Sequence, residues 1–313
     1  MIIGYLKIYN VKKRMKGKIN MEKSKVYFTK NITPESLVKI YEKLEKELTG
    51  NVAVKISTGE PGGHNFLNPN LIKDLVNKLN GTIVECNTAY EGRRNTTVEH
   101  YKAAKEHGFM DIAKVDIMDE DGDIAIPVKN GKHLKENYVG KNLENYDSML
   151  MLSHFKGHQM GGFGGALKNM SIGVASASGK AWIHSAGVTK EVSEVWKKVA
   201  KQDDFLESMA EADESVISYM KGNIVYINVI NNLSIDCDCN NNPEAPCMAD
   251  IGITASIDPV AVDKASLDLI YNSEDKGKER LIARIEKMHG IRIIEHAEEL
   301  GIGKSTYELI NID

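Results

Sequence analysis

Short apolar runs alternate with amphipathic segments along most of the chain, which predicts strands and helices that follow one another. The apolar runs of strand length lie at residues 52–56, 82–86, 148–153, 224–230 and 251–256. Apolar side chains recur at helical spacing within residues 33–50, 71–79, 97–107, 166–174 and 258–270. This alternation is typical of an α/β protein with a mostly parallel sheet and flanking helices.

The boundaries and length of these segments suggest how the chain is divided. Thr33 and Asp258 each precede a proline, as a helix N-cap does, and Gly50 is the expected end of the first helix. Residues 190–220 are strongly helical. Two arrangements remain open: one domain over residues 21–313, or two lobes at 21–189 and 221–313 that residues 190–220 join across a cleft.

Composition and charge exclude several classes of protein. The chain has 313 residues, is 42% hydrophobic and 27% charged, and has a net charge of −4. These values predict a globular protein and make nucleic acid an unexpected partner. Residues 1–20 hold six basic residues and no acidic one. We interpret them as a basic N-terminal extension, with a targeting or membrane-touching arm as the alternative.

The expected compartment follows from the apolar runs. The run at residues 1–6 is too short for a secretory signal, and no later run approaches the length of a transmembrane helix. We therefore expect a cytoplasmic protein that does not bind a membrane and whose cysteines are in a reducing environment.

Polar loops follow three of the predicted strands, at residues 58–65, 87–95 and 154–165. Because ligands of open α/β sheets lie beyond the carboxyl ends of the strands, we expect these loops to meet around a small anionic metabolite. Glycine-rich sequence before the helix at 166–174 would free amide donors for phosphate or carboxylate. The candidate cofactor-binding residues there are Gly161, Gly162, Gly164, Gly165 and Lys168.

Histidines and a lysine are concentrated in the same stretch. His154 and His158 come after the end of a predicted strand, and His184 follows the predicted helix at 166–174. Lys168 lies about one turn inside that helix, so its amine can lean back toward the helix start. A structural histidine and a solvated lysine are the ordinary alternatives. The concentration of these residues favours a functional site, with His154 and His184 as candidate metal ligands.

Three of the four cysteines form a second candidate metal site. In an extended chain Cys237 and Cys239 point the same way, so both thiolates can bind one metal or cluster, and Cys247 follows as a third candidate ligand. Zinc and an iron–sulfur cluster with one open iron both suit three thiolates. The alternative is a pair of reduced packing residues. Cys86, alone within a predicted strand, is expected in the core.

The stretch from Lys55 through His184, with Cys237-Asp238-Cys239 and Asp250-Ile251-Gly252-Ile253, resembles the family called domain of unknown function 362. Its members are often labelled iron–sulfur centre proteins. The resemblance implies an iron–sulfur or other metal site but no established reaction. The C-x-x-C-x-x-C run that some relatives carry is absent here, so a ferredoxin-like module is not expected.

A second, more distant resemblance concerns the spacing of His158, Lys168 and His184, which is similar to that of the nickel-pincer lactate racemase family. By that resemblance His158 would transfer a proton, Lys168 would tether the nickel-pincer nucleotide, and His184 would bind nickel. Arg93 lies in a loop like the family's substrate loop. The second catalytic histidine of the family has no counterpart, because the loop offers Tyr90 and Arg93.

Three functions remain open. The first is a metal-dependent enzyme, of racemase, isomerase or redox type, that acts on a small carboxylate- or phosphate-bearing metabolite. Its catalytic residues would be His158, Lys168 and Arg93, around a single iron, nickel or zinc ion, a cluster or the nickel-pincer nucleotide. It predicts that His158, Lys168 and His184 share one cavity with Arg93. The second is a non-enzymatic iron–sulfur or metal carrier, which predicts an exposed cysteine loop. The third is a nucleotide-binding module.

Overall fold

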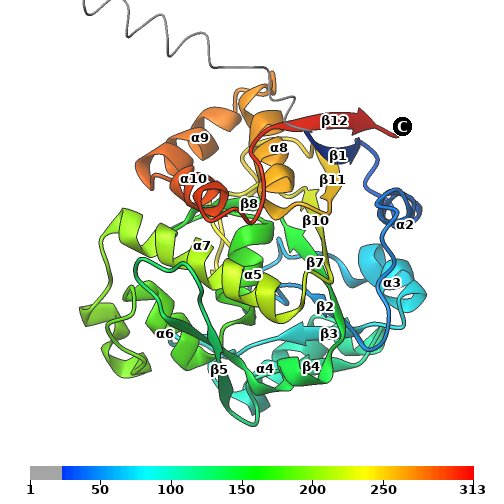
Figure 1. Ribbon diagram of the computed structural model, residues 1–313. Coiled ribbons are helices and arrows are strands. Elements are labelled where there is room, and N and C mark those ends of the chain that lie inside the picture. Colours follow the sequence, from blue (N-terminus) through cyan, green and yellow to red (C-terminus); the bar gives the residue numbers. More distant parts are fainter. Residues whose placement is uncertain (1–22) are drawn as a thin grey trace, which may run out of the picture.

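The structure is a computed structural model that describes residues 23–313 (Figure 1). Within these residues one eight-stranded sheet has the order β12-β1-β11-β10-β7-β2-β3-β4. All neighbouring strands are parallel except β11, which runs against both β1 and β10. The strands are β1 (Ser24–Thr29), β2 (Val52–Lys55), β3 (Thr82–Glu85), β4 (Val115–Ile117), β7 (Ser148–His154), β10 (Ile224–Ile230), β11 (Gly252–Ser256) and β12 (Tyr307–Asn311). The predicted α/β class is confirmed. The predicted basic extension at residues 1–20 lies outside the described residues.

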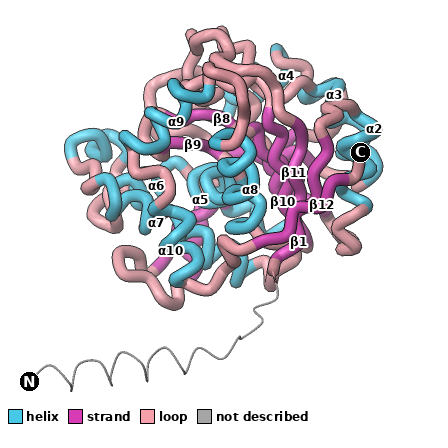
Figure 2. Tube along the Cα trace, turned by 90° about the horizontal axis from the view of Figure 1, so that it is seen from above, coloured by secondary structure: helices cyan, strands magenta, loops and turns pink. Residues whose placement is uncertain are grey.

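Helices cover both faces of this sheet (Figures 1 and 2). Leu150 and Leu152 of β7 belong to one core cluster, whereas Met149 and Met151 belong to the other, as the alternation of side chains along a strand requires. The first face is covered by α2 (Pro34–Glu42), α3 (Pro69–Lys78) and α4 (Thr97–Glu106). The second is covered by α5 (Ala166–Val174), α6 (Ala177–His184), α7 (Gln202–Tyr219), α8 (Pro259–Tyr271), α9 (Lys278–Lys287) and α10 (Arg292–Glu299).

Several helix starts follow from side-chain caps. The hydroxyl of Thr33 accepts a hydrogen bond from the Ser36 amide, and the Asn68 side chain accepts one from Asn70. The Asp258 carboxylate accepts from the amides of Val260 and Ala261. A proline follows each of these caps, where its missing N–H leaves no hydrogen bond unmade.

Some boundaries differ from the prediction for local reasons. The helix expected over residues 33–50 ends at Glu42, and Glu45 then has a positive φ of 52°, a conformation that stops a helix. Leu44 and Leu48 remain buried without being helical. The helical interval 190–220 contains a 3-10 turn, η3 (Val192–Lys197), before α7.

Two small hairpins interrupt the α/β pattern. The first pairs β5 (Asp123–Pro127) with β6 (Glu136–Gly140), and the second pairs β8 (Lys156–His158) with β9 (Gly162–Gly164). The second hairpin occupies most of the glycine-rich loop predicted at 154–165. Two further 3-10 turns are η1 (Phe109–Asp111) and η2 (Lys141–Asn145).

The two intervals predicted as alternative lobes contribute to the same sheet. β10, from the later interval, pairs in parallel with β7, from the earlier one, over six residue pairs. β12 near the C-terminus pairs with β1, so the two ends of the described chain lie side by side (Figure 1). Within residues 23–313 no helix is long and apolar enough to cross a membrane.

Candidate functional site

A cavity of about 460 Å³ lies beyond the carboxyl ends of β2, β3, β7 and β10. These four strands are parallel neighbours, so the loops that follow them emerge at the same edge of the sheet. The expectation that the three polar loops meet is confirmed, since Glu60, Tyr90 and His158 all line the cavity. The predicted site residues that line it are His154, His158, Gly164, Gly165, Lys168, His184, Cys237 and Cys239; Arg93, Gly161, Gly162 and Cys247 do not.

Lys168, in the first turn of α5, directs its side chain into this cavity. Among residues 23–313 its amine has no hydrogen-bond or ion-pair partner. Burial, reinforced by the positive charges of Lys156 and Lys55, lowers the pKa of Lys168 to about 7. An amine with this pKa is partly neutral at physiological pH, so it can act as a nucleophile or a base.

The start of α5 is occupied by a carboxylate of the protein itself. Asp263, on α8, accepts hydrogen bonds from the amides of Ala166 at 2.7 Å and Leu167 at 2.9 Å. The sequence predicts that these amides bind the phosphate or carboxylate of a ligand, but here Asp263 takes that position. The expectation of an anion site at the helix N-terminus is therefore corrected for this structure.

Three of the four predicted cofactor-binding glycines lie close against a protein neighbour, and Gly164 does not. A Cβ on Gly165 would lie 2.4 Å from the Asp263 carboxylate, so glycine allows that carboxylate to reach α5. Gly161 donates its amide hydrogen to Nδ1 of His158. Gly162 has a φ of +78° and lies against Gly290. Gly164 has space, since its nearest neighbours to an added Cβ are 3.9 and 4.0 Å away.

His158 is held in one tautomer by backbone amides. Its Nδ1 accepts hydrogen bonds from the amides of Gly161 at 2.8 Å and Met160 at 3.2 Å. The ring proton therefore belongs on Nε2, since a proton on Nδ1 would oppose two N–H groups. Burial and the charges of Lys168 and Lys156 hold the pKa of His158 well below its usual value. His158 thus presents a neutral N–H donor to the cavity.

His184 has the opposite tautomer. Its Nδ1 lies 2.7 Å from the carbonyl oxygen of Lys180 and donates to it, which leaves the lone pair of Nε2 free. The ring stacks on Phe205 with 4.8 Å between centroids. Burial lowers the pKa of His184 to about 4, although the hydrogen bond to the Lys180 carbonyl raises it. An imidazole with a fixed Nδ1–H and a free Nε2 suits a metal ligand.

His154 has partners on both ring nitrogens. Nδ1 lies 2.9 Å from Asp238, and Nε2 lies 2.7 Å from the carbonyl oxygen of Asn231. Lys156 binds the other oxygen of Asp238 at 2.6 Å. Burial alone would raise the pKa of Asp238, but His154 and Lys156 lower it far below its usual range. In this arrangement His154 anchors the segment around Asp238, and neither of its nitrogens is available to a metal.

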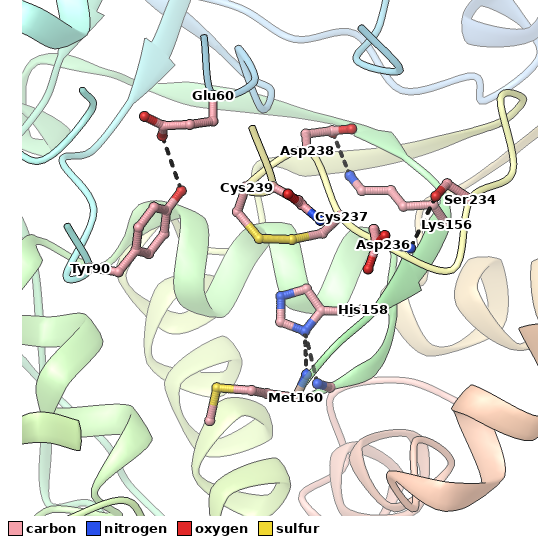
Figure 3. The surroundings of a disulfide bond; sticks show 12 residues. Glu60, Tyr90, Lys156, His158, Met160, Ser234, Asp236, Cys237, Asp238 and Cys239 are labelled. Carbon is pink, nitrogen blue, oxygen red and sulfur yellow. Dashed lines mark hydrogen bonds and ion pairs between the residues drawn. A yellow bond between two sulfur atoms is a disulfide. The ribbon is translucent and has the colours of Figure 1, made fainter. Parts of the chain in front are cut away.

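The two cysteines of the Cys-Asp-Cys segment lie beside His158 (Figure 3). They are joined by a disulfide with a Cα–Cα distance of 5.2 Å, whereas the sequence predicts two free thiolates. One ligand atom each from His158, Cys237 and Cys239 lies within 4.8 Å of the others. The metal-binding role predicted for these cysteines therefore concerns their reduced form and stays a prediction.

Cys247 does not lie with Cys237 and Cys239 at the cavity. Its thiol donates to the carbonyl oxygen of Leu233 at 3.2 Å, and its pKa is raised by burial. Since Cys247 does not line the cavity that Cys237 and Cys239 line, the structure does not form the predicted three-thiolate site. Cys86 is buried, as expected.

The sequence predicted Arg93 for the cavity, but the structure has Arg94 there. Arg93 lies at the surface and pairs with Glu106 at 2.7 Å. Arg94 is buried and binds Glu60 at 3.0 Å and Glu85 at 3.3 Å. Arg93 and Arg94 lie in a turn, where neighbouring side chains can face different sides, so a pair of arginines in a loop does not reveal which one faces inward.

Sequence reasoning also missed a buried ion pair at the cavity wall. Lys55, the last residue of β2, binds Glu85 at 2.8 Å and the side-chain oxygen of Asn169 at 3.1 Å. Burial would raise the pKa of Glu85, but Lys55 and Arg94 lower it to about 2. A lysine at the end of an otherwise apolar strand is the signal that could have identified this pair.

A second group with the donor atoms of a metal site lies outside the cavity, at His133, Asp204 and Glu207. Glu207 already binds Lys132 at 2.7 Å and Arg292 at 2.8 Å. Because these cations compensate its charge, the group is explained as an ion-pair network that joins the β5–β6 connection to α7 and α10.

The sheet and the cavity define an α/β protein with a cavity at the carboxyl edge of its parallel strands. The family described as Domain of unknown function (DUF362) matches residues 52–268, and the chain belongs to that family. No curated protein matches this chain.

Two solved structures are similar in part. One is the lactate racemase apoprotein from Thermoanaerobacterium thermosaccharolyticum, with 13% identity, a TM-score of 0.44, and coverage of 79% of this chain and 57% of that one. The other is a protein from Thermotoga maritima, with 14% identity, a TM-score of 0.41, and coverage of 85% and 58%. The chain spans less than two thirds of either protein.

Proposed function

We propose that this chain is an enzyme that acts on a small carboxylate- or phosphate-bearing metabolite, with a transition-metal cofactor bound at Lys168 and His184. A racemase, isomerase or redox reaction fits this site. The observation that carries the proposal is the amine of Lys168, which faces the cavity, has no hydrogen-bond or ion-pair partner within residues 23–313, and has a pKa lowered to about 7. Lys168 is half-buried, so water compensates its charge only in part.

The charges of the cavity support an anionic ligand. Lys55, Arg94 and Lys156 line the cavity and are each neutralised by a carboxylate. Lys180 also lines it, and its amine donates to the backbone carbonyl of Ala175. Together with Lys168, this gives two amines without a carboxylate partner in the described chain, and an anion would compensate their charge.

The chemistry of His184 and Lys168 fits a metal-bearing cofactor. His184 can offer the Nε2 lone pair to a transition metal, because its Nδ1–H is held by the Lys180 carbonyl. Lys168 can form a covalent or ionic bond to the cofactor, as the resemblance to the nickel-pincer family implies. When bound, such a cofactor supplies two-electron chemistry at a substrate carbon.

The remaining side chains would bind and orient the substrate. His158 offers its Nε2–H as a hydrogen-bond donor, so it suits an oxygen of the substrate better than it suits a metal. Arg94, fixed by Glu60 and Glu85, is the arginine at the cavity wall. Its contribution is a fixed positive charge, since its guanidinium is already bound to carboxylates.

The carrier alternative is less well supported. It predicts an exposed cysteine loop, but Cys237 is buried, and both sulfurs belong to residues that line the cavity. An iron–sulfur cluster held by three thiolates also does not fit, since Cys247 faces the Leu233 carbonyl.

Metal and mass analysis of protein purified without oxygen tests the proposal. We expect a stoichiometric transition metal by elemental analysis for iron, nickel and zinc, and an added mass on the Lys168 peptide. His184→Ala should lose the metal and Lys168→Met the added mass, whereas His64→Ala and Lys73→Met, at exposed positions, should lose neither. Wild-type protein that carries no metal, and takes none up on reconstitution, would contradict the proposal.

A further inference from the structure

We propose that Cys237 and Cys239 form a thiol–disulfide redox pair that exchanges two electrons with a small dithiol or disulfide compound that enters the cavity. This activity is separate from the proposed metal chemistry and does not depend on it. It rests on the position of the two sulfurs, on the anchoring of the segment that carries them, and on the donor that His158 directs at them.

The segment between the two cysteines is anchored on several sides. The Asp238 side chain is bound by His154 at 2.9 Å and by Lys156 at 2.6 Å, and its carbonyl oxygen accepts from the Glu60 amide at 2.7 Å. None of these contacts involves sulfur, so they persist whether the disulfide is formed or broken. The two thiols of the reduced form would therefore stay close enough to close again.

The two sulfurs differ in access. Cys237 is 2% exposed, whereas Cys239 is half-buried, and both residues line the cavity. A compound in the cavity thus meets Cys239 first. Figure 3 shows the ring of His158 between the disulfide and the amides near Met160, with the nitrogen that is not bonded to those amides turned toward the sulfurs. Since that nitrogen carries the proton, it can donate to a leaving thiolate.

The exchange balances without any other reactant. One thiolate of the dithiol attacks Sγ of Cys239, and the disulfide breaks. Cys237 leaves with the electron pair and receives the hydrogen bond from His158. The mixed disulfide joins one sulfur of the compound to Sγ of Cys239. The second thiol of the compound then attacks that first sulfur of the compound and releases Cys239. The compound is oxidised to its disulfide, the cysteines are reduced, and the two protons of the dithiol end on the two cysteine sulfurs.

The other two cysteines are built differently and serve as controls. Cys86 is buried and donates to the Val174 carbonyl, and Cys247 donates to the Leu233 carbonyl. Each thus has a fixed acceptor for its proton and no second cysteine bonded to it. We expect neither to take part in the exchange.

The test uses the whole chain, equilibrated in buffers of varying ratio of reduced to oxidised dithiothreitol. Iodoacetamide then alkylates free thiols, and mass spectrometry measures the mass of the peptide that contains Cys237 and Cys239. We expect both cysteines to be modified or both to be protected, with one two-electron midpoint, and Cys247→Ser should leave that midpoint unchanged. The proposal is overturned if the peptide is fully modified even in oxidised dithiothreitol, or if folded protein cannot be reduced.

The redox midpoint of two His158 variants tests the role of His158 in the exchange. His158→Phe removes the N–H donor and should favour the disulfide about tenfold, which shifts the midpoint by about 30 mV for two electrons. His158→Gln keeps an amide donor and should restore part of the shift. Equal midpoints in the wild type and both variants would show that His158 does not assist the exchange. Cys239→Ser should leave Cys237 free to react in every buffer.

Discussion

At the scale of single residues, burial and charge give similar side chains different properties. Lys55 and Lys168 both line the cavity, but Lys55 is bonded to Glu85 and to Asn169, whereas Lys168 has no partner in the described chain. His158 and His184 also differ through their neighbours, since Nδ1 of His158 accepts hydrogen bonds and Nδ1 of His184 donates one. These neighbours decide which groups are available for chemistry.

The lowered pKa of Lys168 makes its effect on stability depend on pH. Its folded-state pKa of about 7 lies below its usual value, so the folded state resists the proton that the unfolded chain accepts. Stability therefore falls as the pH decreases from about 10 toward 7. We expect Lys168→Met to raise the free energy of unfolding by about 2 kcal/mol near pH 6, with little difference near pH 10.

Urea denaturation of wild type and Lys168→Met across this range measures the difference. Lys73→Met, at an exposed position, is the matched control and should show no such trend. A constant difference between wild type and Lys168→Met at all pH values would show that the amine is not desolvated in the folded protein.

The effect of pH on the stability that Glu85 contributes has the opposite sign to that of Lys168. The Glu85 pKa of about 2 lies below the usual value, so its contribution to stability is complete above about pH 5 and decreases as the pH falls toward 2. Glu85→Gln leaves Lys55 without its carboxylate partner, whereas Arg94 keeps Glu60, and we expect a loss of about 3–5 kcal/mol at neutral pH. Between about pH 5 and pH 3 the variant should lose less stability than wild type.

Chemical denaturation at several pH values tests this expectation. Glu308→Gln changes an exposed glutamate in the same way and should have little effect. If Glu85→Gln unfolded with the same free energy as the wild type, the buried ion pair would not stabilise the fold.

At the scale of the elements, the position of α5 depends on Asp263 of α8. Burial raises the pKa of this carboxyl to about 6, and the hydrogen bonds from Asn228, Leu167 and Ala166 oppose that effect. The contact brings the start of α5, and with it Lys168, to a fixed place at the cavity. It also requires a residue without a Cβ at position 165.

Gly165→Ala should therefore destabilise the protein. The added Cβ would lie 2.4 Å from one oxygen of Asp263 and 2.8 Å from the ring of Phe155. We expect a loss of about 1–3 kcal/mol in the free energy of unfolding. Gly164→Ala is the matched control, because its Cβ would meet only side-chain atoms at 3.9 and 4.0 Å. Equal effects of the two substitutions would argue against the Asp263 contact.

At the scale of the whole molecule, one sheet joins the earlier and later parts of the chain. β7 lies between β2 and β10, and β1 lies between β11 and β12. Neither residues 21–189 nor residues 221–313 thus contain all the neighbours of their own strands. The cavity, likewise, takes residues from loops after strands of both parts.

This arrangement predicts one cooperative unfolding transition. Circular dichroism and the fluorescence of Trp182 and Trp196 should give the same midpoint in urea, since separate lobes would unfold separately. Residues 21–189 expressed alone should lack stable structure, because β7 would lose its pairing with β10. Two resolved transitions would support the two-lobe arrangement instead.

The sequence by itself determined the α/β class, most strands and helix starts, and the stretch that contains the site. These features are local: apolar periodicity, proline after a capping residue and glycine-rich loops all act over a few neighbouring residues. The concentration of histidines around Lys168 is likewise a property of one short stretch, so the sequence alone displays it.

Only the tertiary structure decided which of those residues meet. Asp263 occupies the start of α5 from almost a hundred residues away, Arg94 rather than Arg93 faces inward, and Cys247 is kept apart from Cys237 and Cys239. The tautomers of His158 and His184 also depend on hydrogen bonds that folding forms. Such outcomes depend on distances between segments remote in the chain, which local patterns do not encode.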